Sequence, residues 1–279
     1  MKPITALAPW FGSNRTLAEN VGLALAGCEW VGVPFAGGMC ELLHIKSRSL
    51  LVSDLHLHVL NLAAVAADSV LNPQLRERLA GLPHHPDVLR AAQVRCIDRE
   101  AVANGKGFDR ETTPDLDWAC DYFVCCWWAR NGTAGTQREF EAGHSVRWDA
   151  GGGDSALRIR NATAGLATWQ KVMQRCTFVC LDVFAFLDRV HDKVEHGLYL
   201  DPPFPGPGDK FKHRFTVADH RLLAGRLLAL RACRVVCRFY DHPLIQELYP
   251  EDQWTWNRFT GRKQTNEAGP EVLLTRRHE

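Results

Sequence analysis

Six short apolar runs, most of them rich in β-branched residues, constrain the fold of this chain more than any other feature. They cover residues 28–35, 49–54, 177–182, 197–201, 234–240 and 271–274. Most end in a polar, proline-containing or glycine-containing stretch, and helix-like sequence follows several of them. Near-continuous apolar strands that alternate with helices are typical of a parallel sheet that helices cover on both faces. We therefore expect an α/β fold with a mainly parallel sheet.

Three of the apolar runs end in an aspartate, at Asp54, Asp182 and Asp201. The carboxyl ends of parallel strands meet at one edge of the sheet, and open α/β folds bind their ligands there. The sequence therefore predicts that these three carboxylates lie at a binding edge.

Residues 72–175 interrupt the alternation of strand and helix. Glycines gather at 104–107, 131–135 and 151–153, and one strong helix pattern runs over 115–130. Glycine gives the backbone conformational freedom and favours loops. We expect an inserted second domain over 72–175, loop-rich with a few helices, and a main domain formed by 1–71 and 176–279.

The balance of charge limits the kinds of partner. The chain has 33 Lys and Arg against 32 Asp and Glu, which argues against a protein that coats polyanions by bulk charge. The first residues lack the apolar core of a signal peptide. The most apolar stretch, 49–67, is interrupted by Asp54, His56 and His58, so we expect no membrane span and a cytoplasmic location.

Cysteine and histidine spacing does not predict a metal site. The ten cysteines include no CxxC pair, so we expect reduced, structural thiols. His56 and His58 are two residues apart and would face different ways on a helix. We assign no metal.

The sequence Asp201-Pro202-Pro203-Phe204 follows a predicted strand and carries the clearest chemistry. Two prolines hold the backbone extended and remove two amide donors. Such a turn suits an amino group on a planar ring: Asp201 and the Pro202 carbonyl each accept one hydrogen, and Phe204 stacks on the ring. The simpler interpretation is a strand that ends in a proline-rich turn with an exposed Phe.

A second turn, Pro34-Phe35-Ala36-Gly37-Gly38-Met39, lies between a predicted strand and a helix-like stretch. Glycines there let a backbone approach a ligand closely. The GxGxxG fingerprint is absent, which argues against a nicotinamide or flavin enzyme. Asp54 ends the next strand, where an acid usually binds ribose hydroxyls. A tight turn and a helix-capping Asp would explain the same residues.

In this order the motifs resemble the Dam-like adenine-specific DNA methyltransferases, especially those carried by phages and prophages. The resemblance covers about 8–70 and 176–275 and implies a Rossmann-like fold that binds S-adenosylmethionine (SAM), with one antiparallel C-terminal strand. It implies catalysis by Asp201 to Phe204. The implied SAM-binding residues are Trp10, Phe11, Gly12, Arg15, Phe35, Ala36, Gly37, Gly38, Asp54 and Asp182.

The sequence departs from the family pattern at several positions. Ser13 and Asn14 replace the usual Gly-Lys, and Met39 stands where a second spaced glycine often occurs. Val33 lacks the acid that often precedes the proline, and Phe204 replaces the commoner Tyr. Phe204 keeps the ring face that stacking requires.

Basic residues gather in three regions that could contact DNA. They are the loop after the catalytic motif, the C-terminal part and the inserted domain, which the resemblance equates with the target-recognition region. The residues we select are Lys210, Lys212, Arg214, Arg138 and Arg147. Trp127 and Trp128 belong to the 115–130 helix pattern, and we interpret them as helix core rather than base-stacking residues.

The resulting hypothesis is methyl transfer from SAM to the N6 amino group of adenine in DNA. The base must leave the helix to reach a buried cofactor. We expect a double-stranded DNA substrate, a monomer without an obligatory protein partner, and a bacterial or phage-infected host. Two alternatives remain: an N4-cytosine methyltransferase, and a catalytically inert nucleic-acid-binding protein on the same fold.

Overall fold

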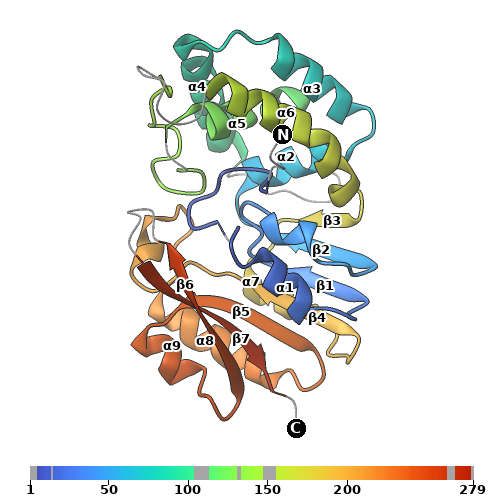
Figure 1. Cartoon of the computed structure of the whole chain (residues 1–279), viewed down its shortest axis with the longest axis vertical. Helices are drawn as coiled ribbons and strands as arrows, with labels where there is room; N and C mark the ends of the chain where they lie inside the picture. Colours follow the sequence, from blue (N-terminus) through green and yellow to red (C-terminus); the bar gives the residue numbers. More distant parts are fainter. Residues whose placement is uncertain are drawn as a thin grey trace. The chain divides into compact units, whose positions relative to one another are not determined.

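The computed structural model describes residues 5–13, 15–103, 113–130, 133–146, 155–262 and 268–277. Within them, seven strands form a sheet with the order β3-β2-β1-β4-β5-β7-β6 (Figure 1). β1 pairs in parallel with β2 and β4, and β4 with β5, whereas β7 is antiparallel to both β5 and β6. The strands are β1 Trp30–Val33, β2 Ser49–Ser53, β3 Cys176–Val179, β4 His196–Leu200, β5 Arg234–Tyr240, β6 Trp254–Arg262 and β7 Ala268–Arg276.

The predicted α/β class with a mostly parallel sheet is confirmed, and each of the six apolar runs overlaps a strand. The central strands β4 and β5 are buried almost without interruption. β6 was not among the predicted strands. Its side chains alternate, with Trp254 and Trp256 turned inward while Thr255 and Asn257 are exposed. A search for continuous apolar runs misses a strand of this kind.

Contacts along the chain define two compact units. The helical unit contains Met1–Ser13, Gly37–Cys40 and His56–Cys180, and the sheet unit contains Asn14–Ala36, Glu41–Leu55 and Leu181–Glu279. The predicted boundary between residues 71 and 72 lies within the first turn of α3 (Leu71–Gly81), after α2 (Leu57–Ala67). The contact-based units instead place α2 in the helical unit, because α2 packs against α5 and α6.

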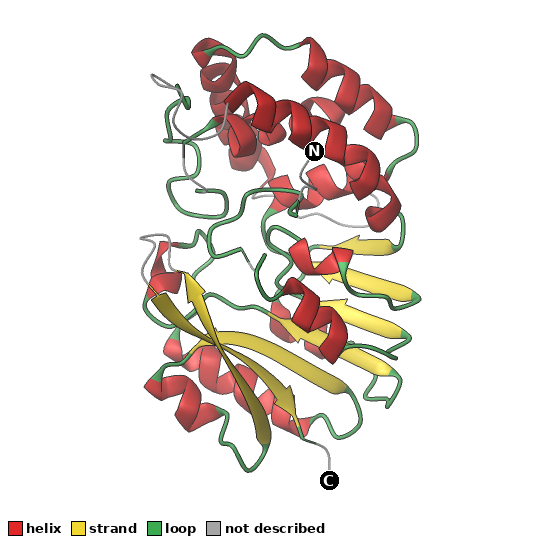
Figure 2. Ribbon diagram, in the orientation of Figure 1, coloured by secondary structure: helices red, strands yellow, loops and turns green. Residues whose placement is uncertain are grey.

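The helical unit has more helix than the loop-rich segment that we predicted (Figure 2). Besides α2 and α3 it contains α4 (Pro86–Ala103), α5 (Leu116–Trp128) and α6 (Ser155–Met173). The predicted 115–130 pattern corresponds to α5, whose N-cap Asp115 accepts a hydrogen bond from the Trp118 amide at 2.9 Å. Trp127 and Trp128 are buried, so their predicted place in the helix core is confirmed.

The sheet unit adds short helices to its strands. α1 (Ala18–Ala24) and α8 (Val217–Ala229) lie on opposite faces of the sheet (Figure 1). The remaining elements are α7 (Val183–Leu187), α9 (Pro243–Leu248) and the 3₁₀ turns Cys40–Leu43 and Pro207–Lys210.

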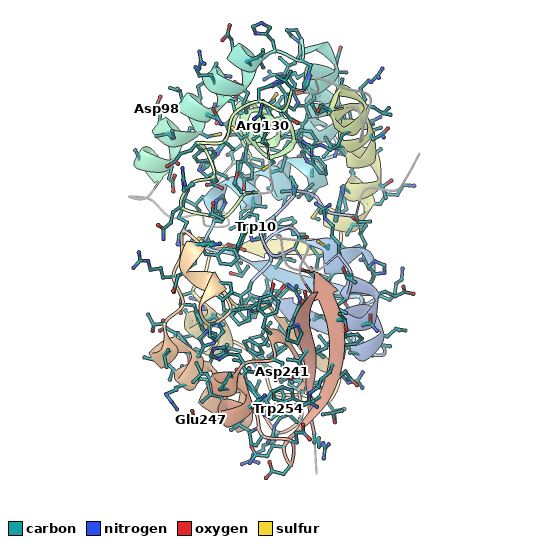
Figure 3. The ribbon with its side chains drawn as sticks, turned by 60° about the vertical axis from the view of Figure 1, so that its left-hand side comes forward. Trp10, Asp98, Arg130, Asp241, Glu247 and Trp254 are labelled. Atoms are coloured by element: carbon teal, nitrogen blue, oxygen red, sulfur yellow. The ribbon has the colours of Figure 1, made fainter. Side chains whose placement is uncertain are left out.

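Aromatic packing and an exposed ion pair connect α8, α9 and β6 of the sheet unit. Trp254 is fully buried and meets Tyr249 edge to face at 5.0 Å. Glu247 of α9, which is labelled in Figure 3, pairs with Arg221 of α8 at 2.6 Å. Among the described helices, none combines the length and the apolar character needed to cross a bilayer.

Candidate functional site

The carboxyl edge of the sheet brings together residues from three strands. Extending the β1–β2 and β1–β4 registers beyond the strand ends places Phe35 level with Asp54 and with Asp201. β1 lies between β2 and β4, so the connections after β1 and β4 run to opposite sides. Ligands of open α/β sheets bind at such a switch point. These three predicted residues therefore lie where the fold favours binding.

Asp201 follows β4, and its side chain is 17% exposed. Arg238 Nη1 donates to its two carboxylate oxygens at 3.0 and 3.3 Å, and the Tyr199 hydroxyl donates to Oδ2 at 3.3 Å. Burial raises the pKa of Asp201 above its ordinary value, although the positive charge and hydrogen bonds of Arg238 act in the opposite direction. The predicted catalytic acid is thus a half-buried carboxyl with a charged partner.

Arg238 connects Asp201 to a second acid. It lies in β5, is 4% exposed, and donates from Nε and Nη2 to Glu271 of β7, both at 2.9 Å. Sequence analysis did not select Arg238 or Glu271. The available signal was a charged residue within the apolar run 234–240, because an Arg is rarely buried unless it is paired.

The Phe204 ring is held by two neighbours from β5. The Arg238 guanidinium lies 5.1 Å from the ring centroid, and Tyr240 meets the ring edge to face at 4.7 Å. Phe204 is half-buried, so part of the ring is accessible. This geometry leaves an aromatic surface next to the Asp201 carboxylate.

Two glycines fold the chain after the motif back onto it. Gly206 has φ of 83°, in the region that favours glycine, and the Gly208 amide donates to the Phe204 carbonyl at 2.8 Å. A Cβ at Gly208 would lie 2.8 Å from the Pro203 carbonyl carbon. These glycines therefore fix the turn rather than merely making a loop flexible.

His220 of α8 packs beside the same turn and was not selected from the sequence. It is 1% exposed, and Phe215 meets its ring edge to face at 4.8 Å. Burial lowers the pKa of His220 to about 4, although the Pro203 backbone and Asp219 act in the opposite direction. At neutral pH, His220 is an uncharged packing partner of the turn.

Three half-buried phenylalanines form an aromatic group near the same edge of the sheet. Phe215 meets Phe35 edge to face at 5.6 Å and stacks with Phe184 at 6.3 Å. Asp182 is exposed and caps α7 by accepting from the Phe184 amide at 2.8 Å. Aromatic rings that remain partly accessible suit a planar heterocycle.

Glu41 is a buried acid that sequence analysis missed. It is 3% exposed, and its Oε1 has no hydrogen-bond partner among the described residues. Burial raises the pKa of Glu41 to about 8; the charges of Asp201 and Asp54 add to the increase, and Arg238 and the Glu41 backbone oppose it. The signal in the sequence was an acid in the otherwise apolar Cys40–Leu43.

In the helical unit, the glycines of the predicted turn leave room for the Trp10 side chain of the same protein. A Cβ at Gly37 or Gly38 would lie 3.0 or 2.9 Å from Trp10, which is labelled in Figure 3. Gly37 has φ of 45°. Met39 is buried at φ of 59°, the conformation that favours the glycine expected there. The structure therefore brings Trp10, Gly37 and Gly38 together.

The other SAM-binding residues predicted from the N-terminal motif and the glycine turn do not share the contacts that join Trp10, Gly37 and Gly38. The Phe11 amide donates to the Ala134 carbonyl at 3.2 Å, and Gly12 has φ of 70°. Ala36 is buried, and its amide donates to the Ser53 carbonyl at 3.1 Å. Arg15 is exposed.

The predicted DNA-binding residues lie mainly on the surface. Lys210 and Arg214 are exposed and Lys212 is half-buried, all shortly after the Asp201–Phe204 turn. Arg138 is exposed and pairs with Glu141 at 2.6 Å. Arg147 lies outside the described residues.

One group in the helical unit has side chains that could chelate a metal. Ligand atoms of His58, Glu100 and Glu139 lie within 4.8 Å of one another. However, His58 Nδ1 accepts a hydrogen bond from Trp118 Nε1 at 2.7 Å, so in neutral His58 the proton is on Nε2. His58 then has no ring lone pair left for a metal, and we propose no metal there.

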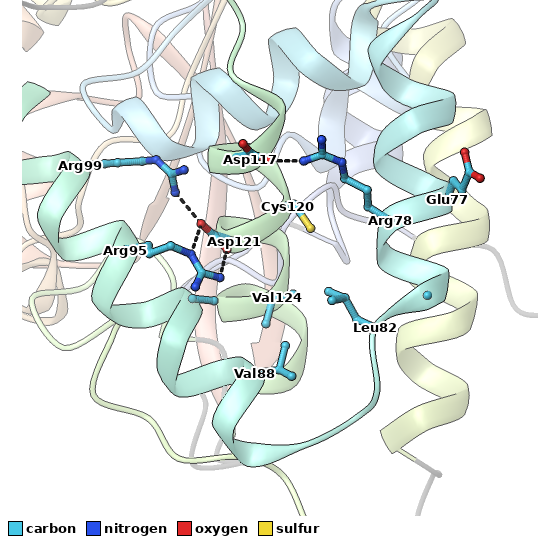
Figure 4. Close-up of a pocket in the computed structure, with 12 residues that line it drawn as sticks. Glu77, Arg78, Leu82, Val88, Arg95, Arg99, Asp117, Cys120, Asp121 and Val124 are labelled. Atoms are coloured by element: carbon cyan, nitrogen blue, oxygen red, sulfur yellow. Dashed lines mark hydrogen bonds and ion pairs between the residues drawn. The ribbon is translucent and has the colours of Figure 1, made fainter.

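A cavity of about 570 Å³ lies within the helical unit, lined by residues of α3, α4 and α5 (Figure 4). Its three arginines are paired with aspartates. Arg95 and Arg99 bind Asp121 at 2.6 and 2.5 Å, and Arg78 pairs with Asp117. The ion pairs join neighbouring helices, so a structural role accounts for the charges.

Comparison of the sequence with models of protein families found no match, and a search of curated proteins also found none. The functional argument therefore rests on the motifs and on the geometry of the carboxyl edge.

Proposed function

We propose that this protein transfers the methyl group of SAM to the exocyclic N6 amino group of adenine in DNA. The observation that carries the proposal is the Asp201–Phe204 turn at the carboxyl end of β4, beside the switch point of a Rossmann-like sheet. An acid, an extended Pro-Pro backbone and a half-buried ring lie within four residues there.

The carboxylate of Asp201 has the capacity for this role while it is paired with Arg238. An ionised carboxylate offers about four acceptor positions. Arg238 Nη1 and the Tyr199 hydroxyl account for the protein hydrogen bonds given above, so an amino hydrogen of adenine can be accepted as well. Arg238 favours the ionised form that accepts this hydrogen.

Residues of the sheet unit fit SAM in chemical type. The group Phe35, Phe184 and Phe215 would stack on its adenine, and Asp54 would accept from its ribose hydroxyls. When bound, SAM supplies an electrophilic methyl group. Asp201 and the Pro202 carbonyl would orient the target amino group, and Phe204 would stack on the target base. Transfer would form the N–C bond and break the S–C bond, which would leave S-adenosylhomocysteine, and the amino nitrogen would release one proton to solvent.

Catalysis of this kind depends on orientation and hydrogen bonding, with no covalent enzyme intermediate. The exposed Lys210 and Arg214 would contact phosphates near the turn. Base flipping costs a few kcal/mol, which such contacts help to offset.

The test compares Asp201→Ala with Asp252→Ala, a change of an exposed acid in a turn. We expect Asp201→Ala to reduce methyl transfer at least about 100-fold, because a positioned hydrogen bond to the reacting group is lost. Binding of S-adenosylhomocysteine (SAH) should change only a few-fold, and Asp252→Ala should retain full activity. Near-normal turnover by Asp201→Ala would refute the role of this residue. Circular dichroism checks that the variant is folded.

A further inference from the structure

Glu41 is a buried acid of the sheet unit that the proposed mechanism does not use. Its side chain lies on the 3₁₀ turn after β1, and it is 3% exposed with Oε1 unpartnered among the described residues. A buried carboxyl oxygen without a donor is unfavourable, so a molecule that offers an N–H group there would relieve that cost.

The charges around Glu41 favour a cation. It interacts with Asp54 after β2, with Asp201 after β4 and with Arg238 of β5. Arg238 is also shared with Glu271. The positive charge of Arg238 is thus shared among carboxylates, and the charges of Asp201 and Asp54 favour a cation near Glu41.

We propose that Glu41 binds the α-ammonium group of the amino-acid part of SAM and releases its own proton to solvent when the ligand binds. This inference rests on the proposed function, because it assigns a further residue to the same site. The product is a carboxylate–ammonium pair in which the ligand keeps its three N–H donors and Glu41 provides the negative charge.

Hydrogen-bond chemistry selects the ammonium group over the other parts of SAM. The sulfonium is cationic but has no N–H or O–H donor, and the ribose hydroxyls donate but carry no charge. Only the ammonium group can both donate to Oε1 and stabilise ionised Glu41. Burial raises the pKa of Glu41 to about 8, so the acid is mostly protonated at pH 7 before the ligand binds.

Calorimetry with two ligands tests the proposal. SAH contains the ammonium group, whereas 5′-methylthioadenosine keeps the adenosine and the sulfur but lacks the amino-acid part. Titrations at pH 7 in buffers of different ionisation enthalpy count the protons released. We expect close to one proton per SAH, in line with the linkage of ionisation to binding, and none for methylthioadenosine.

The variant Glu41→Gln removes the ionisable group and keeps the shape. We expect it to bind SAH about tenfold more weakly, since a hydrogen bond between charged groups is replaced by a weaker one. It should release no proton and should bind methylthioadenosine as the unmodified protein does. Glu19→Gln, on the exposed side of α1, is the matched control and should behave as the unmodified protein.

The outcomes distinguish this inference from the proposed function. SAH binding without proton release, or equal SAH affinity in Glu41→Gln, would overturn the role of Glu41 and leave the proposed function standing. If neither ligand binds the unmodified protein, the proposed function fails and the role of Glu41 fails with it.

Discussion

Replacing Glu41 by Gln should make the ligand-free protein more stable at neutral pH. Burial raises the pKa of Glu41 from an ordinary 4.5 to about 8. The contribution of the protonated Glu41 carboxyl to the free energy of unfolding is therefore complete below about pH 4.5 and is lost as the pH rises towards 8. Between those values the unfolded chain releases the proton while the folded chain keeps it, which favours unfolding.

The magnitude follows from the two pKa values. Over the range in which only the unfolded carboxyl is ionised, each pH unit lowers the free energy of unfolding by about 1.4 kcal/mol. From pH 5 to pH 7 the unmodified protein should thus lose about 2.5 kcal/mol relative to Glu41→Gln, which has no proton to release. Other titrating groups are common to both proteins and cancel in the difference.

Urea unfolding at pH 5, 6 and 7, followed by tryptophan fluorescence, measures this difference. We expect the stability of Glu41→Gln minus that of the unmodified protein to increase steadily with pH. In Glu19→Gln, the exposed control, the corresponding difference should stay constant. A constant difference for Glu41→Gln would refute the reasoning, because it would mean that Glu41 is already ionised in the folded chain.

Three further changes test the turn and its support. Arg238→Met should lower the free energy of unfolding in urea by about 3–5 kcal/mol, because it leaves two buried carboxylates without their cation, and adding Glu271→Leu should restore part of that loss. Gly208→Ala should lower the free energy of unfolding in urea by about 1–3 kcal/mol and reduce methyl transfer, since the added methyl overlaps Pro203. The control Gly225→Ala, on the open side of α8, should leave the free energy of unfolding unchanged or raise it. Phe204→Tyr should retain the rate of methyl transfer. Phe204→Ala should lower that rate at least about tenfold, because base stacking contributes about 1–3 kcal/mol. Equal rates in Phe204→Ala and the unmodified protein would contradict the stacking role.

The sheet was predictable because its central strands are buried on both faces. Their apolar runs stand out in the sequence, and β4 and β5 coincide closely with two of them. β6 alternates between inward and exposed side chains and was missed. α3, α4 and α6 were also missed as individual helices, since much of their surface is exposed and charged residues interrupt their apolar positions.

The candidate site was predictable only where one short motif contains the chemistry. Asp201 and Phe204 lie in such a motif, and their place after β4 agrees with the predicted strand. The partners of Asp201 come from elsewhere in the chain: Arg238 is 37 residues away, and Glu271 follows it by another 33. Glu41 belongs to the turn after β1. Pairings of this kind depend on strand order, which a single sequence does not specify.

The most direct test of the central claim is transfer of labelled methyl from SAM to DNA. Duplexes of varied sequence are incubated with the protein and labelled SAM, then digested to nucleosides, and the labelled nucleoside is identified. We predict label in N6-methyladenine, reduced at least about 100-fold in Asp201→Ala. Label in N4-methylcytosine would contradict the adenine target. Absence of label from every duplex, with SAH and DNA still bound, would contradict methyl transfer to DNA itself.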